Sequence, residues 1–233
     1  LLAIDLADKQ VVEAIQVARG VQKRRPAESV GYVIEGEVHA SQRAWDKAIA
    51  AYRAGLERDR SVQMAMRLHA AYLSAQREPD AAKFASEWLQ KNPADAEFFG
   101  HLGMLATSRG EFDVAEGHYR KALALQPKDA SAANNVAWLL LKQGKPGALA
   151  LAERANELLP GQPPFLDTLA LALASEKKFD KAIEVERSAM ERRPGEQSYR
   201  LNIARILIQA DRKQEARGEL EKLAALGAKF PDH

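Results

Sequence analysis

The side chains that most often bind metals or transfer protons show no catalytic spacing in this sequence. The five histidines are His39, His69, His101, His118 and His233, and none forms the pair four residues apart that binds zinc on one helix face. Phosphate-binding glycine loops and nucleophile-elbow motifs are also missing. Acidic residues are numerous, but their spacing to Lys and Arg is typical of ion pairs on solvated helix faces. The sequence therefore predicts a protein that is not an enzyme and needs no cofactor or metal.

A second group of residues has chemistry suited to polypeptide recognition. An extended peptide exposes N–H and C=O groups along its length, and asparagine amides can bind both kinds while Met and Trp fill side-chain pockets. We expect the binding residues to be Arg67, His101, Met104, Asn134, Asn135, Trp138, Asp167, Leu171, Asn202 and Arg205. Asn135 and Asn202 are the strongest candidates, because an amide on an apolar helix face is costly without a partner. The alternative is that Met104, Trp138 and Leu171 only pack one helix against the next.

The elements that must position these residues follow from a repeat of small residues. The repeated positions are Ala14, Ala48, Ala81, Ala115, Ala148, Ala182 and Ala216, which are 33 or 34 residues apart. A proline follows five of them at an interval of twelve residues, and Gly110 and Gly144 mark turns where a left-handed residue ends a helix. No strand-like alternation or low-complexity tract interrupts this pattern. The period predicts an all-α solenoid of helix pairs, continuous over residues 1–233.

This helix–turn–helix period resembles the tetratricopeptide repeat. The segment 96–129 carries the pattern most fully, in Leu102, Gly103, Gly110, Phe112, Ala115, Tyr119, Ala122 and Pro127. In this frame the units are 1–28 (partial), 29–61, 62–95, 96–129, 130–162, 163–196 and 197–233. The unit 62–95 departs from the pattern, with Gln76 at the turn and Trp88 at a position for a small residue. We expect irregular packing there and an early helix start at Pro79.

The resemblance implies a right-handed superhelix whose concave groove, lined by the first helix of each pair, binds peptides or proteins. The ninth position of each unit then faces the groove, at Glu37, Ala70, Met104, Trp138, Leu171 and Arg205. One alternative is a chaperone-type adaptor that binds a C-terminal carboxylate. Asn135 and Arg205 fit such a clamp, but Gly100 and Asp167 stand where it needs Lys, and Asp167 would repel a carboxylate. Another alternative is the helical part of a larger enzyme, such as a glycosyltransferase.

Local sequence also resembles one bacterial system. The segments 44–52, 133–139, 148–155 and 166–169, together with the Phe230-Pro231 ending, are similar to the C-terminal part of the tetratricopeptide lipoproteins of PEP-CTERM/exosortase loci. That resemblance implies a scaffold for surface protein sorting and exopolysaccharide export, in the periplasm or anchored to the outer membrane. The absence of cysteine fits the periplasm and the cytoplasm equally.

The composition of the chain favours a protein as its binding partner over a nucleic acid or a membrane. The chain is 46% apolar and 28% charged, which is typical of a folded soluble protein, and its net charge of +2 lacks the basic field that nucleic acids require. The longest apolar stretches, 136–141 and 169–174, are too short to span a membrane. We expect further repeats before Leu1, a capping helix at 214–226, and a native C-terminus near His233. An open first unit would let two chains associate through Leu1, Leu2, Ile4 and Leu6.

Overall fold

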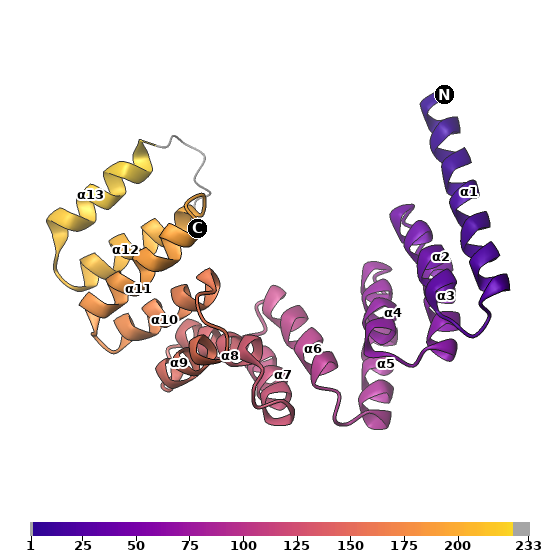
Figure 1. Cartoon of the computed structure of the whole chain (residues 1–233). Helices are drawn as coiled ribbons and strands as arrows, with labels where there is room; N and C mark the ends of the chain where they lie inside the picture. Colours follow the sequence, from indigo (N-terminus) through magenta and orange to yellow (C-terminus); the bar gives the residue numbers. More distant parts are fainter. Residues whose placement is uncertain (1, 226–233) are drawn as a thin grey trace. The chain divides into compact units, whose positions relative to one another are not determined.

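The computed structural model describes residues 2–225, with side chains from residue 10 onward, and over this range the chain is helical without a strand (Figure 1). The helices are α1 (Leu2–Arg24), α2 (Val30–Ser41), α3 (Trp45–Arg58), α4 (Val62–Ser74), α5 (Glu78–Lys91), α6 (Ala96–Ser108), α7 (Phe112–Leu125), α8 (Ala130–Lys142), α9 (Ala148–Leu158), α10 (Pro163–Ser175), α11 (Phe179–Arg192), α12 (Gln197–Gln209) and α13 (Lys213–Ala224). The predicted all-α fold of helix pairs is confirmed.

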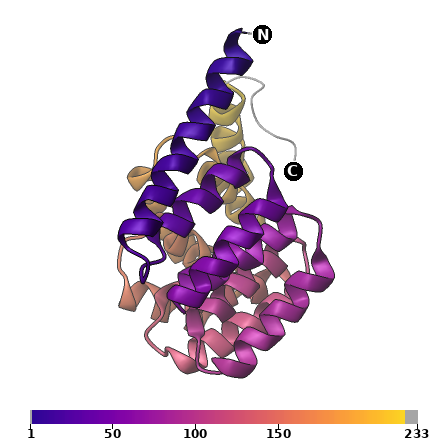
Figure 2. The same cartoon turned by 90° about the vertical axis from the view of Figure 1, so that its right-hand side faces the viewer.

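The helices form two compact units, Leu1–His101 and Leu102–His233, which we call unit 1 and unit 2. Within unit 1, each helix from α1 to α5 packs against the next one along the chain. Figure 2 shows α1, in indigo, beside the next helix of unit 1. Within unit 2, the helices from α7 to α13 do the same, and α10 also contacts α8 and α12. The first helices of successive pairs in unit 2 are therefore neighbours, and their exposed sides adjoin.

Gly147 (φ 95°) precedes α9 in the left-handed conformation, and in addition the turn inside each helix pair contains one left-handed residue at an equivalent position of the repeat. These residues are Arg43 (φ 55°), Gln76 (φ 57°), Gly110 (φ 73°), Gly144 (φ 63°), Lys177 (φ 60°) and Asp211 (φ 58°). The prediction for Gly110 and Gly144 is confirmed, and Gln76 adopts the same conformation despite its side chain. A left-handed non-glycine residue costs about 1–2 kcal/mol. The geometry of the turn therefore overrides the preference of the residue at four of these positions.

Close crossings between the two helices of a pair explain the glycines within the first helices. A Cβ atom added to Gly36 would lie 2.3 Å from the Tyr52 ring, and one added to Gly103 would lie 2.9 Å from the Tyr119 ring. Both tyrosine rings are buried. In these two repeats a glycine in the first helix therefore provides the space that an aromatic ring from the second helix fills.

The unit 62–95 shows how a departure from the pattern is accommodated. His69 occupies the position equivalent to Gly36 and Gly103, and the residue opposite is the small Ala85 in place of tyrosine. Trp88 is buried, and its Nε1 donates a hydrogen bond to Asp95 Oδ2 at 2.8 Å. The expected early start at Pro79 is wrong: α5 begins two residues after the left-handed Gln76, as α7 does after Gly110. Proline fits there because the first helical N–H groups have no partner within the helix.

The first helix also differs from the expected form. The repeat pattern predicts the end of a first helix, a turn and then a complete second helix within the residues that form α1. The structure instead has a single helix of 23 residues, compared with 11–14 residues for the other helices. The helix continues through Asp8-Lys9-Gln10, the residues at the expected turn. The expectations for the side chains of Leu1, Leu2, Ile4 and Leu6, and for Phe230, Pro231 and His233, lie outside the described residues.

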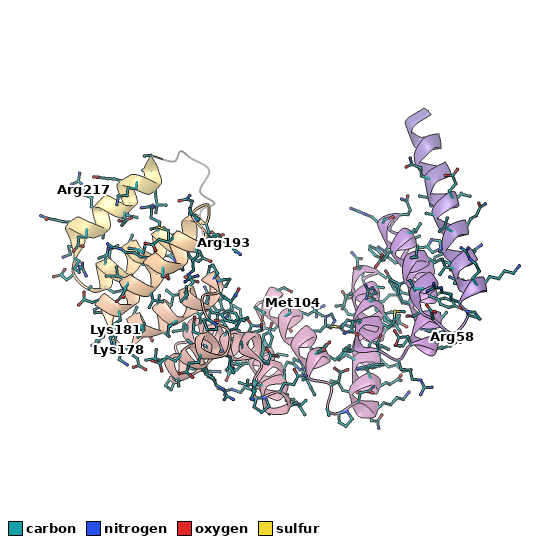
Figure 3. The ribbon with its side chains drawn as sticks, viewed as in Figure 1. Arg58, Met104, Lys178, Lys181, Arg193 and Arg217 are labelled. Atoms are coloured by element: carbon teal, nitrogen blue, oxygen red, sulfur yellow. The ribbon has the colours of Figure 1, made fainter. Side chains whose placement is uncertain are left out.

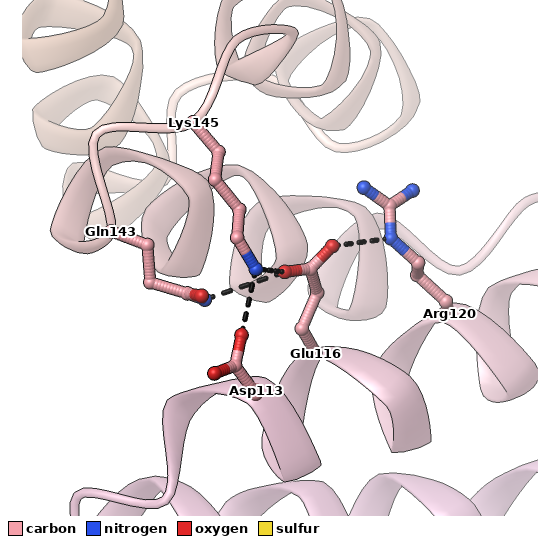
Figure 4. A network of polar contacts seen from close by, with 5 residues as sticks. All are labelled: Asp113, Glu116, Arg120, Gln143 and Lys145. Carbon is pink, nitrogen blue, oxygen red and sulfur yellow. Dashed lines mark hydrogen bonds and ion pairs between the residues drawn. The ribbon is translucent and has the colours of Figure 1, made fainter.

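Ion pairs connect neighbouring repeats at the turns. Lys145 Nζ lies 2.7 Å from Asp113 Oδ1 and 2.9 Å from Glu116 Oε2, and Arg120 Nε donates to Glu116 Oε1 at 2.7 Å (Figure 4). The hydrogen bonds from Arg120 and Lys145 lower the pKa of Glu116. Equivalent pairs join Arg77 to Asp46 at 3.1 Å and Arg212 to Asp180 at 2.9 Å. This network belongs to the connection between repeats, as expected for ion pairs on helix surfaces.

Candidate functional site

The candidate site in unit 2 begins on α8, where three of the predicted residues, Asn134, Asn135 and Trp138, lie within five positions. Trp138 is partly buried, and its ring packs edge-to-face on Phe112 with centroids 5.9 Å apart. Lys142 Nζ lies over the indole ring, 5.2 Å from its centroid. Asn135 is partly buried one turn away on the same helix face, whereas Asn134 is 7% exposed and its Oδ1 has no hydrogen-bond partner among the described residues.

The polar residues of the next two first helices are joined directly. Asn202 Nδ2 on α12 donates a hydrogen bond to Asp167 Oδ1 on α10 at 2.7 Å. Asp167 is partly buried, and this burial raises the pKa of its carboxyl group, while hydrogen bonds with Glu186 and Asn202 act in the opposite direction. Helix α10 also contacts α8 directly, so the two first helices adjoin. The three first helices α8, α10 and α12 thus present one continuous face, which we call the first-helix face of unit 2.

Apolar and basic side chains complete the first-helix face of unit 2. Leu171 lies one turn after Asp167 on α10 and is partly buried, and Arg205 lies on α12 with its side chain exposed. Met104 projects from α6 and is 55% exposed (Figure 3). All six residues at the ninth positions of the repeats are exposed or partly buried, and none is fully buried. This pattern is consistent with a surface on the first helices that is open to a ligand.

The two candidates in unit 1 have different surroundings. Arg67 on α4 is exposed, and its Nε lies 3.5 Å from Glu37 Oε1 on α2. His101 on α6 is 8% exposed, and its Nε2 lies 2.9 Å from Nδ1 of His69. Burial lowers the pKa of His101. His101 therefore contributes to the interior of unit 1, which corrects its expected place on an open surface.

Glu186 on α11 is a polar residue of this region that the sequence pattern did not reveal. It is 0% exposed, and its carboxyl group is hydrogen-bonded to Asp167 and Asn202. Burial and the charge of Asp167 raise the pKa of Glu186 to about 10, so the group is protonated at neutral pH. The expectation that acidic residues lie on solvated faces is wrong for Glu186. A sequence signal existed, because Glu186 stands four residues after Ala182, where other repeats have Tyr52 and Tyr119.

Two features of the described residues concern metal binding and membrane-spanning helices. No group of three or more His, Asp or Glu side chains within the described part is placed to hold a metal ion. Among the helices of that part, none combines the length and the apolar character needed to cross a membrane.

One segment of the chain matches a known protein family. Residues 102–163, which include α7, α8 and α9, match the family model described as tetratricopeptide repeat. This segment contains Met104, Asn134, Asn135 and Trp138.

Solved structures with the same arrangement of helices include three bacterial proteins. MamA from Desulfovibrio magneticus has a TM-score of 0.61 at 22% identity, over 70% of this chain and 93% of that one. A tetratricopeptide repeat protein from Parabacteroides merdae has a TM-score of 0.67 at 12% identity, and the match covers 85% of this chain and 80% of that protein. PilF from Pseudomonas aeruginosa has a TM-score of 0.63 at 17% identity, and the match covers 96% of this chain and 95% of that protein. At these identities the likeness establishes the fold.

A curated relative matches a shorter stretch. The probable biofilm formation methyltransferase WspC of Pseudomonas putida is 41% identical over 69 residues, which are 29% of this chain and 16% of that protein. The match spans a minor part of the methyltransferase's own length.

Proposed function

We propose that this chain, a tetratricopeptide repeat protein in its fold and in the sequence of residues 102–163, is a non-enzymatic scaffold that binds an extended polypeptide on the first-helix face of unit 2. The observation that carries the proposal is the continuity of this face. Helix α10 contacts both α8 and α12, and the hydrogen bond from Asn202 to Asp167 joins α10 to α12. Tetratricopeptide repeats are interaction modules for proteins, which is the class of ligand that such a face suits.

The chemistry of the face fits a peptide backbone with alternating side chains. Asn135 offers an amide that both donates and accepts, and Trp138 and Leu171 offer apolar area at one-repeat spacing. Trp138 also packs on Phe112 and on the core of unit 2, so part of its surface has a structural role. The two roles coexist because one edge of an indole ring can pack inward while another meets a ligand.

The test uses a display library of random ten-residue peptides. Wild-type protein is expected to enrich a shared motif, and Asn135→Ala together with Trp138→Ala is expected to weaken binding of that motif by about 2 kcal/mol or more. Trp138→Phe keeps a ring against Phe112, and so separates loss of the ligand contact from loss of packing. Val114→Ala with Leu125→Ala is the matched control, since both residues are exposed on α7. Thermal unfolding accompanies each variant.

Enrichment that is equal for wild type and the Asn135/Trp138 variants would contradict this location of the site. Absence of any enriched peptide for the folded wild type would contradict peptide binding itself. Loss of binding in the Trp138→Ala variant accompanied by a collapsed melting temperature, with Trp138→Phe binding normally, would assign Trp138 to the core.

We propose a bacterial envelope system for protein sorting or exopolysaccharide export as the wider setting. The local resemblance of segments 133–139 and 148–155 supports it, and so does a relative named for biofilm formation. The corresponding location is the periplasm or the outer membrane. Fractionation of the source cells tests this: the protein is expected with the envelope and accessible to protease after the outer membrane is permeabilised. Recovery with the cytoplasmic enzymes would contradict it.

A second candidate function is recognition within a larger enzyme. The match to 69 residues of a methyltransferase favours it, because the repeats there belong to an enzyme's chain. In that case the full gene product would modify the peptides that the repeats capture, and mass spectrometry would show a methyl or sugar adduct. Captured peptides of unchanged mass after incubation with methyl and glycosyl donors support the scaffold. A chaperone-type adaptor remains the third candidate, for which enriched peptides would share a free C-terminal carboxylate.

A further inference from the structure

A groove with a volume of about 510 Å³ lies between α3 and α5, the second helices of two successive repeats in unit 1. Leu56 on α3 and the rings of Phe84 and Trp88 on α5 form its apolar lining. The two rings lie one turn apart on α5, with their centroids separated by 6.3 Å. Helix α4 packs against both α3 and α5, and the centroid of its buried Tyr72 ring lies 6.2 Å from that of Phe84. The same helix therefore holds both walls of the groove in place.

The repeat fold does not require two aromatic rings at these positions of α5. None of the other complete repeats has an aromatic residue at both equivalent positions, which are occupied by Ala51 and Gly55, His118 and Ala122, Leu151 and Ala155, Val185 and Ala189, and Glu219 and Leu223. Phe84 packs only partly against the core of unit 1, and the rest of its surface lines the groove. The rings thus give the second helices an apolar surface that the packing of the repeat does not need.

Three exposed basic side chains surround this apolar lining, namely Arg53 and Arg60 on the side of α3 and Lys91 at the end of α5. Arg53 Nη2 donates a hydrogen bond to the hydroxyl group of Tyr72, which fixes the guanidinium at the groove and leaves other N–H groups of Arg53 to donate. Neither Arg60 nor Lys91 forms an ion pair with a residue of the described part. The groove therefore holds cationic donors that the fold itself does not use.

Two carboxylates also line the groove. The charge of Glu57 is compensated by the adjacent Arg58, whose Nη1 lies 3.6 Å from Glu57 Oε2. Glu87 on α5 is exposed. Three basic groups therefore stand against one uncompensated carboxylate, so the groove attracts negative charge.

We propose that this groove is a second binding surface of the protein, which takes an acidic segment of a partner protein with an apolar side chain between its carboxylates. The apolar side chain would pack on Leu56 and Phe84. The carboxylates would accept hydrogen bonds from Arg53, Arg60 and Lys91. This groove shares no residue with the first-helix face of unit 2, so the inference does not rest on the proposed function.

The experiment is a selection from a display library of ten-residue peptides on the whole chain. The central residue of each peptide is Phe or Leu, and the flanking positions are random among Asp, Glu, Asn, Gln, Lys and Arg. Wild-type protein is expected to enrich Asp and Glu at the flanks. Calorimetry then compares one enriched peptide with its Asn/Gln counterpart, and the acidic peptide is expected to bind about tenfold or more tightly.

Charge reversal at exposed positions locates the site. Arg60→Glu together with Lys91→Glu is expected to weaken binding of the acidic peptide by about tenfold or more. Lys213→Glu together with Arg217→Glu is the matched control, because it makes the same change in net charge on α13, where both side chains are 79% exposed. Phe84→Leu keeps an apolar side chain in the core and is expected to weaken binding severalfold, with thermal unfolding as the check on folding.

Enrichment of neutral or basic flanks, or equal losses in the groove variant and the α13 variant, would overturn the inference. So would full binding of the acidic peptide by the groove variant and its loss in Asn135→Ala with Trp138→Ala, because the peptide would then bind on the first-helix face of unit 2. Absence of any enriched peptide from this library would also overturn the inference. The proposed function is tested separately by the fully random library.

Discussion

The Nδ1 atom of His69 lies 2.9 Å from Nε2 of His101, and the two imidazole rings are 4% and 8% exposed inside unit 1. Their centroids are 5.1 Å apart, and both rings also contact Phe98, at 5.8 Å and 5.6 Å. One hydrogen atom between the two nitrogens makes this contact a hydrogen bond. A second proton would place two N–H groups against each other in an apolar site, so the pair is stable only in its neutral form.

The histidine pair predicts a loss of stability in mild acid. Burial lowers the pKa of His101 in the folded state below 6.5, so the unfolded chain takes up protons first as the pH falls. The stability contribution is complete above pH 6.5 and is lost as the pH falls from there toward the lowered pKa, by at most about 1.4 kcal/mol per pH unit for one group. Urea unfolding at about pH 7.5 and about pH 5.5 measures this change.

The variant His101→Gln keeps a polar partner for His69 and removes the titration. Its stability is expected to fall less between the two pH values than that of the wild type. A remaining dependence belongs to His39 and His118, whose pKa values burial also lowers, and to Glu186, whose raised pKa gives a dependence of opposite sign in both proteins. Equal losses in the variant and the wild type would show that His101 does not contribute.

The left-handed turn residues predict stabilising substitutions. Gln76 and Lys177 have φ values of 57° and 60°, which glycine adopts without strain. Gln76→Gly and Lys177→Gly are each expected to stabilise the protein by about 0.5–1 kcal/mol, because the relieved strain exceeds the added flexibility of the unfolded chain. Gly110→Ala is the opposite control and is expected to destabilise by a similar amount. A loss of stability in both glycine variants would contradict the turn geometry.

The crossing of Gly36 and Tyr52 predicts coupled effects. Gly36→Ala places a Cβ atom 2.3 Å from the Tyr52 ring and is expected to destabilise by about 1–3 kcal/mol. In a Tyr52→Ala background the same change is expected to be nearly neutral or stabilising, because the ring is gone. A double-mutant cycle by chemical denaturation measures the coupling. Additive effects would mean that the two residues do not share this space.

The raised pKa of Glu186 predicts that stability falls as the pH rises, which is opposite to the effect predicted for His101. The pKa of Glu186 rises from 4.5 to about 10 on folding, so between these values the folded protein holds a proton that the unfolded chain releases. Stability is therefore complete below pH 4.5 for this group and is lost as the pH rises toward 10. Glu186→Gln is expected to stabilise the protein more at about pH 8.5 than at about pH 5, and the exposed Glu184→Gln is the control. An equal effect at both pH values would contradict a neutral Glu186.

The repeat period and the turn residues were predictable from the sequence because they depend on short-range requirements. Small residues at intervals of 33 or 34 are needed wherever two helices cross, and Gly110 and Gly144 mark the left-handed turns. The same frame placed Trp138, Leu171 and Arg205 at positions that the structure leaves exposed or partly buried. The helix pairs and the outward-facing ninth positions thus follow from local spacing alone.

The tertiary structure decided which polar residues are buried and what they meet. His101, Asn134 and Asn202 share the repeat positions of residues that face outward, yet all three are covered. Their cover comes from helices of other repeats, and a period of about 34 residues carries no information on the size of the neighbouring side chains. The raised pKa of Glu186 depends on its burial and on its neighbours Asp167 and Asn202, which only the tertiary structure brings next to it. In such an array, local spacing determines the helices, whereas contacts between repeats determine the charge and the accessibility of the site.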